Sequence, residues 1–232
     1  MLERISINCH SSIKIQDKIT IYIDPFKIQE ILNDADYIFI THSHYDHCSV
    51  DDISKVIKKD TKIITTSDTE EKLKILKISK ERILEVKPNE KYELKDIKFS
   101  TIPAYNINKN FHTKENNWVG YIIEFNGIKY YVAGDTDNIK EIQELECDIA
   151  FLPIGGTYTM NAEEAACLAN TIKANLIIPI HYGEIVGDKN DLETFLELVK
   201  KDTEVLIRNK NNKWHFNLLC PRWTKLTILP RP

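Results

Sequence analysis

Four side chains that can bind a metal ion lie within six residues of one segment, THSHYDH at 41–47: His42, His44, Asp46 and His47. His42 and His44 are two residues apart, so on an extended backbone both imidazoles can point in the same direction. A turn after them could bring Asp46 and His47 to a second, adjacent position. Imidazole together with carboxylate suits zinc and other borderline divalent ions such as iron, manganese or nickel. The segment therefore predicts a metal site.

The residues around this segment predict its place in a fold. YIFIT at 37–41 is a continuous apolar run of the kind that is buried on both faces of a sheet, and the metal-binding side chains follow at its end. Loops at the ends of strands are where α/β sheets place their sites. Alternating apolar and polar residues upstream predict antiparallel strands, at 5–9, 13–15 and 19–23.

The rest of the chain mixes strand-like and helix-like patterns. Further strands are predicted at 62–66, 97–105, 119–125, 128–135, 149–154, 176–180 and 204–207. The strands at 119–125 and 128–135 are joined by Asn126-Gly127, a strong hairpin signal. Helices are predicted at 51–57, from Ser67 onward, at 161–172 and at 191–200.

Two of these helices have a capping box at their start, formed by Ser67 with Glu70 and by Asn161 with Glu164. The stretch at 69–95 is rich in Lys and Glu, which is typical of the solvated faces of helices. Antiparallel strands first and alternating units later indicate an α/β fold in which helices lie outside packed sheets, in three or four layers.

Charge and cysteine content exclude several classes of protein. The formal net charge is −4, which weighs against binding a nucleic acid or a membrane surface through bulk basic charge. No apolar run is long enough to cross a bilayer. The five cysteines form no CxxC pair, and the polar first residues do not match an export signal. We therefore expect free thiols and a cytoplasmic location.

The domain organisation is predicted to be simple. No linker and no repeat divides the 232 residues, so we expect one domain over 1–232. The tail at 214–232 is atypical, because its composition is strand-like but two prolines close it. An added edge strand and a disordered end are both compatible with this pattern.

Several segments together resemble the metallo-β-lactamase fold superfamily, in the order that this superfamily shows. THSHYDH resembles its metal-binding signature, and IYIDPF at 21–26 resembles the strand and Asp that precede it. YVAGDTD at 131–137 and IPIHYG at 178–183 are similar to the strands that deliver a bridging carboxylate and the last histidine. The resemblance implies an αββα sandwich.

LPIGGTYTMNAEEA at 152–165 is similar to a segment of one branch of this superfamily. That branch consists of metal-dependent hydrolases that include ascorbate-phosphate lactonase-like and N-acylphosphatidylethanolamine phospholipase D-like proteins. The resemblance implies a hydrolase, with two divalent metal ions, zinc first and manganese, nickel or iron as alternatives.

The resemblance also implies roles for particular residues. Site one would use His42, His44 and a third histidine, and site two would use Asp46, His47 and His181, with Asp135 bridging the two ions. Two ions about 3.5–4 Å apart can share a hydroxide and polarise a carbonyl or phosphoryl oxygen. Asp46 would also be catalytic, orienting the hydroxide and passing its proton to the leaving group.

The third histidine departs from the simplest pattern of the superfamily. It is expected near Tyr105 or Asn106, and neither is a histidine. The nearest candidate is His112, in the polar loop at 106–117, and a long loop in a compact domain is often functional. We predict His112 as the missing ligand. A substrate-contacting histidine and a site with a single metal ion are the alternatives.

Two further residues have a functional and a structural interpretation. Asp24, before Pro25, could orient a metal-bound histidine or simply end a strand in a turn. His10 resembles a histidine that lines the site in this branch, and it could equally be a structural histidine.

The predicted reaction is hydrolysis of a small phosphoester, lactone or related ester or amide by a metal-bridged hydroxide. The alternatives are a nucleic-acid-processing metallohydrolase, a di-iron redox protein and a non-catalytic metal-binding protein of the same fold. Net charge and the lack of an added nucleic-acid domain disfavour a nucleic-acid partner, which leaves a small-molecule substrate. The sequence does not define the oligomeric state or the substrate, because pocket shape decides substrate choice.

Overall fold

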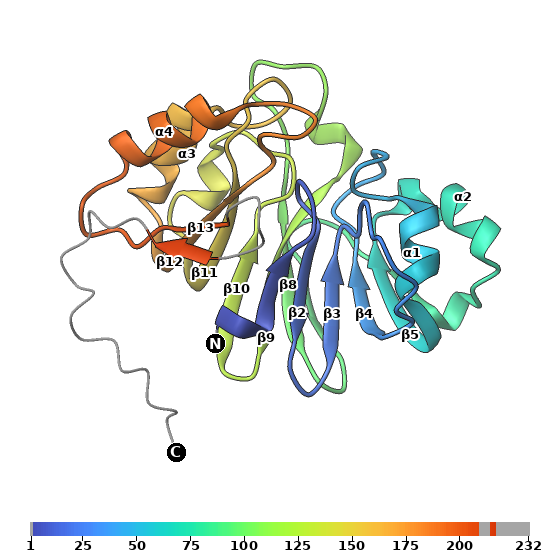
Figure 1. Cartoon of the computed structure of the whole chain (residues 1–232). Coiled ribbons are helices and arrows are strands. Elements are labelled where there is room, and N and C mark those ends of the chain that lie inside the picture. Colours follow the sequence, from blue (N-terminus) through green and yellow to red (C-terminus); the bar gives the residue numbers. More distant parts are fainter. Residues whose placement is uncertain (1, 209–213, 217–232) are drawn as a thin grey trace.

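The computed structural model describes residues 2–208 and 214–216, and two mixed β-sheets lie at its centre (Figure 1). The first sheet has six strands in chain order: β1 (Ile5–Ile7), β2 (Ile13–Gln16), β3 (Thr20–Ile23), β4 (Ala35–Phe39), β5 (Ile57–Thr65) and β6 (Ile83–Glu85). β1, β2 and β3 pair antiparallel, whereas β3 to β6 pair parallel. The predicted antiparallel start of the chain is therefore confirmed.

The second sheet also has six strands, in the order β12-β11-β10-β9-β8-β7. Their bounds are β7 (Lys91–Glu93), β8 (Lys98–Pro103), β9 (Val119–Phe125), β10 (Ile128–Val132), β11 (Glu146–Pro153) and β12 (Lys173–Ile180). β7 to β10 pair antiparallel, and β10, β11 and β12 pair parallel. A short antiparallel pair joins β13 (Leu206–Arg208) to β14 (Trp214–Phe216). The rest of the tail, 217–232, lies outside the described residues.

The two sheets pack face to face through one apolar core. Strands such as β2 alternate between buried and more exposed residues, so that Ile13 and Ile15 point inward, as period-2 patterning requires. Phe39 of the first sheet meets Tyr121 of the second edge to face, with ring centroids 5.0 Å apart. β4 leads directly into the metal-binding segment, and this packing against the second sheet fixes its position.

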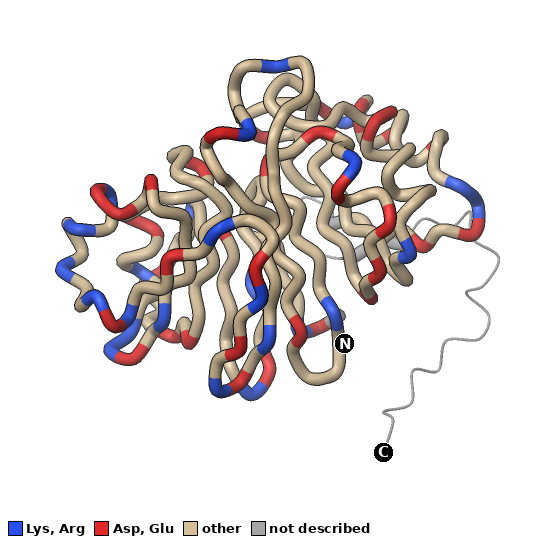
Figure 2. Tube along the Cα trace, turned by 180° about the vertical axis from the view of Figure 1, so that it is seen from behind, with Lys and Arg blue, Asp and Glu red and all other residues tan. Residues whose placement is uncertain are grey.

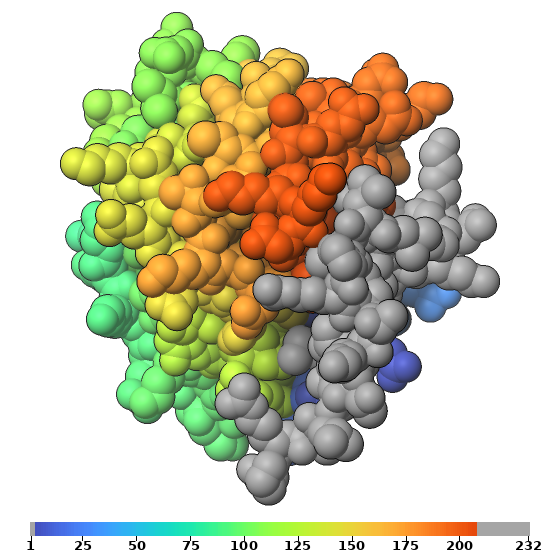
Figure 3. All heavy atoms as spheres, turned by 90° about the vertical axis from the view of Figure 1, so that its left-hand side faces the viewer, coloured from blue at the N-terminus to red at the C-terminus, as the bar shows by residue number. Residues whose placement is uncertain are grey.

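Helices cover the outer face of each sheet. α1 (Val50–Val56) and α2 (Glu70–Leu73) pack on the first sheet through Ile53, Val56 and Leu73. α3 (Ala162–Ala169) and α4 (Lys189–Leu198) cover the second sheet, and Figure 3 shows their side of the molecule as a continuous packed surface. The layers are helix, sheet, sheet, helix, which confirms the predicted αββα sandwich.

Short 3-10 helices connect many of these elements. They span Leu2–Arg4, Ser67–Thr69, Lys74–Leu76, Lys80–Arg82, Lys114–Asn116 and Lys140–Ile142. Among the described residues, no helix is long and apolar enough to span a membrane. Basic and acidic positions are interspersed along the described chain (Figure 2).

Some sequence-based assignments need correction. The capping box of Asn161 and Glu164 is present, although the helix ends at Ala169 rather than 172. Ser67 forms no such box: it starts a 3-10 turn, and the helix after it has four residues. Ile57, predicted to be helical, begins β5.

The predicted helical stretch at 69–95 is wrong in its second half, which contains β6 and β7. Both are three-residue strands at the edges of their sheets, and charged residues occupy part of each. Short, charged strands are a common way to protect a sheet edge, and they carry little apolar periodicity for a sequence pattern to detect.

Candidate metal centre

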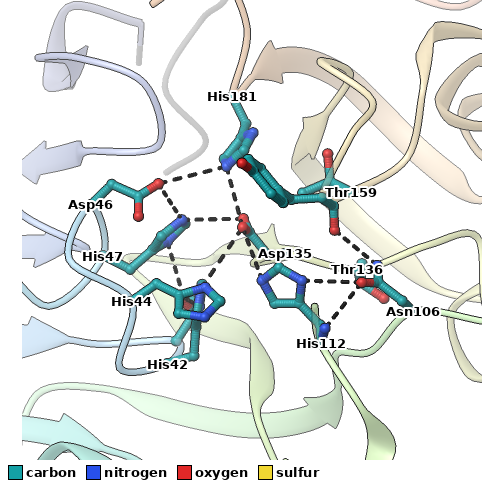
Figure 4. Close-up of polar contacts among 12 residues, drawn as sticks. His42, His44, Asp46, His47, Asn106, His112, Asp135, Thr136, Thr159 and His181 are labelled. Atoms are coloured by element: carbon teal, nitrogen blue, oxygen red, sulfur yellow. Dashed lines mark hydrogen bonds and ion pairs between the residues drawn. The ribbon is translucent and has the colours of Figure 1, made fainter. Parts of the chain in front are cut away.

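The loops that leave four strand ends converge at one edge of the sandwich and bring five histidines and two aspartates together (Figure 4). The loop after β4 carries His42, His44, Asp46 and His47. The loops after β8, β10 and β12 carry His112, Asp135 and His181. The structure therefore places all seven residues that the sequence analysis singled out in one cluster, with contributions from both sheets.

One part of the cluster consists of His42, His44, His112 and Asp135, whose ligand atoms all lie within 4.8 Å of one another. His42 Nε2 lies 3.1 Å from His44 Nδ1 and 3.8 Å from Asp135 Oδ2. His112 Nε2 lies 3.3 Å from the same carboxylate oxygen. The loop at 106–117 thus folds back far enough for His112 to reach the cluster.

The other part surrounds Asp46 and the second side of Asp135. His47 Nε2 lies 3.4 Å from Asp46 Oδ2 and 3.2 Å from Asp135 Oδ1. His181 Nε2 lies 3.8 Å from Asp46 Oδ2 and 3.2 Å from Asp135 Oδ2. The Asp135 carboxylate is therefore shared by both parts of the cluster.

The donor set fits divalent metal ions. Within the described part of the chain, the buried side-chain nitrogen and oxygen atoms that have no hydrogen-bond partner all belong to this cluster or to a histidine in contact with it: they are atoms of His47, His112, Asp135 and His181, and of His10. An unsatisfied buried polar atom costs about 1–3 kcal/mol. A concentration of such atoms at one point is expected where a bound cation supplies the missing partner.

Asp24 orients two of the histidines. Its carboxylate accepts hydrogen bonds from the Thr41 backbone N–H at 2.8 Å and from the Thr41 hydroxyl at 2.7 Å. His47 Nδ1 lies 2.7 Å from the same carboxylate and donates to it, which leaves Nε2 free as a ligand atom. His42 Nδ1 lies 3.0 Å from the Thr41 hydroxyl. The orienting interpretation of Asp24 therefore agrees with the geometry.

Asn106 holds His112 in the same way. Its side-chain oxygen accepts the backbone N–H of His112 at 3.1 Å and lies 3.2 Å from His112 Nδ1. Its side-chain nitrogen donates to Asp137 at 2.9 Å and to the Tyr158 carbonyl at 2.8 Å. Asn106 lies where the superfamily usually has a histidine. Its contacts position His112, which takes the place of that histidine in the cluster.

The loop around His112 is fastened by a second contact to Asp137. Lys109 Nζ donates to the Asp137 carboxylate at 2.6 Å and to the Thr159 carbonyl at 2.8 Å. The Ile107 backbone N–H donates to the other Asp137 oxygen at 2.8 Å. Neither Asn106 nor Lys109 was singled out in the sequence, because their partners lie far along the chain.

His181 depends on a close approach of two backbones. Gly155 lies so near it that an added Cβ would be 2.2 Å from the His181 carbonyl oxygen. His181 itself has a left-handed backbone, with φ of 57°. Only glycine leaves room for this arrangement, which gives a structural reason for Gly155 in the 152–165 segment.

Burial and neighbouring charges shift the pKa values of three histidines of the cluster, downward for His42 and His44 and upward for His47. Burial and His47 hold the pKa of His42 well below its usual value, and burial and His112 lower the pKa of His44. Burial also opposes a charge on His47, but Asp135 and Asp24 outweigh it and raise the pKa of His47 well above its usual value. The two carboxylates therefore favour the charged form of His47 in the metal-free protein, whereas burial disfavours it for His42 and His44.

The αββα sandwich with a histidine and aspartate cluster at one edge has the architecture of a metallo-β-lactamase fold protein. A family model described as a Beta-lactamase superfamily domain matches residues 4–181. A UPF0173 metal-dependent hydrolase of Thermococcus onnurineus is 32% identical over 85% of this chain and 92% of its own length. A second such protein, from Lysinibacillus sphaericus, is 31% identical over 90% and 97%.

Solved structures agree with this assignment. A crystal structure from Parabacteroides distasonis, named as that of a metal-dependent hydrolase, has 30% identity and a TM-score of 0.73, covering 88% of this chain and 91% of that one. The metallo hydrolase Igni18 of Ignicoccus hospitalis shares the fold, with 20% identity, a TM-score of 0.69, and 92% and 97% coverage. The chain therefore belongs to the metallo-β-lactamase fold superfamily and, within it, to the UPF0173 metal-dependent hydrolases.

Replacing Asn106 with Ala should weaken the metal affinity of the part of the cluster that contains His112. The variant loses the oxygen that holds His112, and loss of such an orienting partner typically costs about 10–100-fold in metal affinity. A titration of the metal-free protein with Co²⁺ measures the effect. Asn110→Ala, an exposed position in the same loop, is the matched control. Equal affinities of the two variants would contradict the assigned role.

Metal binding near pH 7 should release a proton from His47. The raised pKa means that this imidazole is charged below that pKa, and the metal must displace its proton, so affinity should fall by about tenfold per unit as pH decreases. Calorimetry in buffers with different heats of ionisation counts the protons released. Asp24→Asn removes one of the charges that raise the pKa, so it should reduce the number of protons released. Unchanged proton release would show that the proton comes from another group.

Proposed function

We propose that the protein hydrolyses a small phosphoester, lactone or related ester or amide with the help of two divalent ions, zinc by preference. The observation that carries this proposal is the shared position of Asp135, whose two oxygens face both parts of the histidine cluster. Membership of a family of metal-dependent hydrolases supports the reaction class.

The metal ligands in this proposal fall into two sets. His42, His44 and His112 hold one ion, and Asp46, His47 and His181 hold the other. Asp135 lies between the two sets. When bound, the ions supply a water molecule of lowered pKa and polarise the carbonyl or phosphoryl oxygen of the substrate.

Asp46 is the proposed proton carrier. Its side chain is only slightly exposed, and its Oδ2 lies between the Nε2 atoms of His47 and His181. Burial opposes its charge, but the hydrogen bond and charge of His47 outweigh burial and lower the pKa of Asp46. A carboxylate that is ionised at neutral pH can accept the proton of the attacking water and return it to the leaving group.

A small-molecule substrate is favoured by the surroundings of the cluster. Two exposed aromatic side chains flank the ligands in sequence: Tyr45 between His44 and Asp46, and Phe111 before His112. Positions of both charges are interspersed along the described chain, as Figure 2 shows, and the formal net charge of −4 disfavours a nucleic-acid partner.

Replacing Asp46 with Asn should lower kcat by about 10²–10⁴, the usual contribution of a positioned acid or base. Substrates to screen are chromogenic phosphodiesters, lactones, esters and amides, tested with the protein loaded with zinc or manganese. Asp51→Asn, at an exposed position in α1, is the matched control.

Metal content per chain is measured alongside, and His112→Ala should reduce it from about two ions to about one. One ion or none in the parent protein, or full activity of Asp46→Asn, would overturn the proposed mechanism.

A further inference from the structure

His10 is a further histidine that lies in contact with the cluster. It lies in the turn between β1 and β2, where the Asn8 N–H donates to the Ser12 carbonyl at 2.9 Å and the Ser12 N–H donates to the Cys9 carbonyl at 2.8 Å. Its side chain has no exposed surface. The hairpin therefore carries an imidazole from the edge of the first sheet into the interior.

The ring of His10 faces two members of the cluster. Its Nε2 lies 3.5 Å from Asp46 Oδ2, and its centroid lies 3.7 Å from the ring centroid of His181, with the planes tilted by 42°. The His181 backbone N–H donates to the His10 carbonyl at 3.3 Å. The loop after β12 and the β1–β2 turn are thus joined directly at the centre.

The position has two energetic costs that nothing else in the described structure explains. His10 has a left-handed backbone with φ of 56°, which costs roughly 1–2 kcal/mol for a residue with a Cβ. Neither of its ring nitrogens has a hydrogen-bond partner, although both are buried. A histidine that only filled space would incur both costs without return, whereas an apolar residue would avoid one of them and glycine would avoid both.

We propose that His10 is an additional metal ligand at the site formed by Asp46 and His181. The ligand atoms of these three residues all lie within 4.8 Å of one another. Two ligands at about 2.0–2.2 Å from one tetrahedral ion are separated by about 3.3–3.6 Å. The separation of His10 Nε2 from Asp46 Oδ2 falls in this range, as does that of His47 Nε2 from the same oxygen. The inference rests on the proposed function, which assigns a metal ion to this site.

The extra imidazole has a consequence for the metal. With His10, the side chains around this ion are Asp46, His47, Asp135, His181 and His10, which exceeds the four ligands of a tetrahedral zinc site. Such a set suits a five-coordinate zinc or an ion that accepts five or six ligands, such as manganese, iron or nickel. The two ions of the centre would then differ in coordination number.

The direct test uses protein labelled with ¹⁵N in its histidines and loaded with ¹¹³Cd²⁺. A nitrogen that binds the ion shows a one-bond coupling to ¹¹³Cd, and a nearby nitrogen that does not bind shows none. The expected result is a coupling from a ring nitrogen of His10 that disappears in His10→Asn. Couplings from His42, His47 and His181 without one from His10 would overturn this inference and leave the metal centre intact. No coupling from any of these histidines would instead overturn the proposed function.

A second measurement uses affinity and needs no substrate. His10→Asn and His10→Gly both tolerate the left-handed backbone, so they remove the imidazole with little risk to folding. Each should weaken binding of the second Co²⁺ ion by at least 10-fold and change its visible absorption, while the first ion binds as in the parent. Ser11→Ala, in the same turn, is the control and should match the parent. Unchanged affinity and an unchanged spectrum in both His10 variants would overturn the proposal.

Discussion

The Asp135 carboxylate is the interaction on which the rest of the centre depends. Its two oxygens lie within 4 Å of nitrogens of His42, His47, His112 and His181, which come from both sheets. Burial opposes its charge, but His181 and His47 outweigh burial and hold the pKa of Asp135 well below its usual value. A buried carboxylate is stable only when such partners surround it. The positions of the histidines are therefore constrained by one charge at the junction of the sheets.

Backbone conformation and close backbone packing, rather than flexible side chains, fix the position of the Asp135 carboxylate. Gly134, directly before Asp135, has φ of 65°, which disfavours any residue with a side chain, and an added Cβ would lie only 3.1 Å from the Val119 carbonyl oxygen and 3.2 Å from Thr41 Cβ. Asp24 has a left-handed backbone too. Strained positions of this kind persist when the packed structure around them leaves no alternative, and three of them, at His10, Asp24 and His181, lie at the centre.

The sequence predicted the parts of the site that are local, and missed the parts that depend on distant partners. His42, His44, Asp46 and His47 are adjacent in the chain, so their spacing alone indicated a metal site. Asn106 gave no signal, because its role arises from contacts with His112 and with Asp137 on another strand end. The sheets were predictable where apolar runs are long, and β6 and β7 were not, because three residues at a charged edge show no clear period.

The order of the proposed ligands along the chain would affect how the protein acquires metal during synthesis. The cluster at 42–47 leaves the ribosome early, whereas His112, Asp135 and His181 belong to a second sheet that is made later. Chains fold from the N-terminus as they emerge, and a complete metal site exists only when all its strands are in place. Until then, the early histidines are open to any ion that binds imidazole. The metal centre proposed above would therefore be complete only after β12 has docked beside β11.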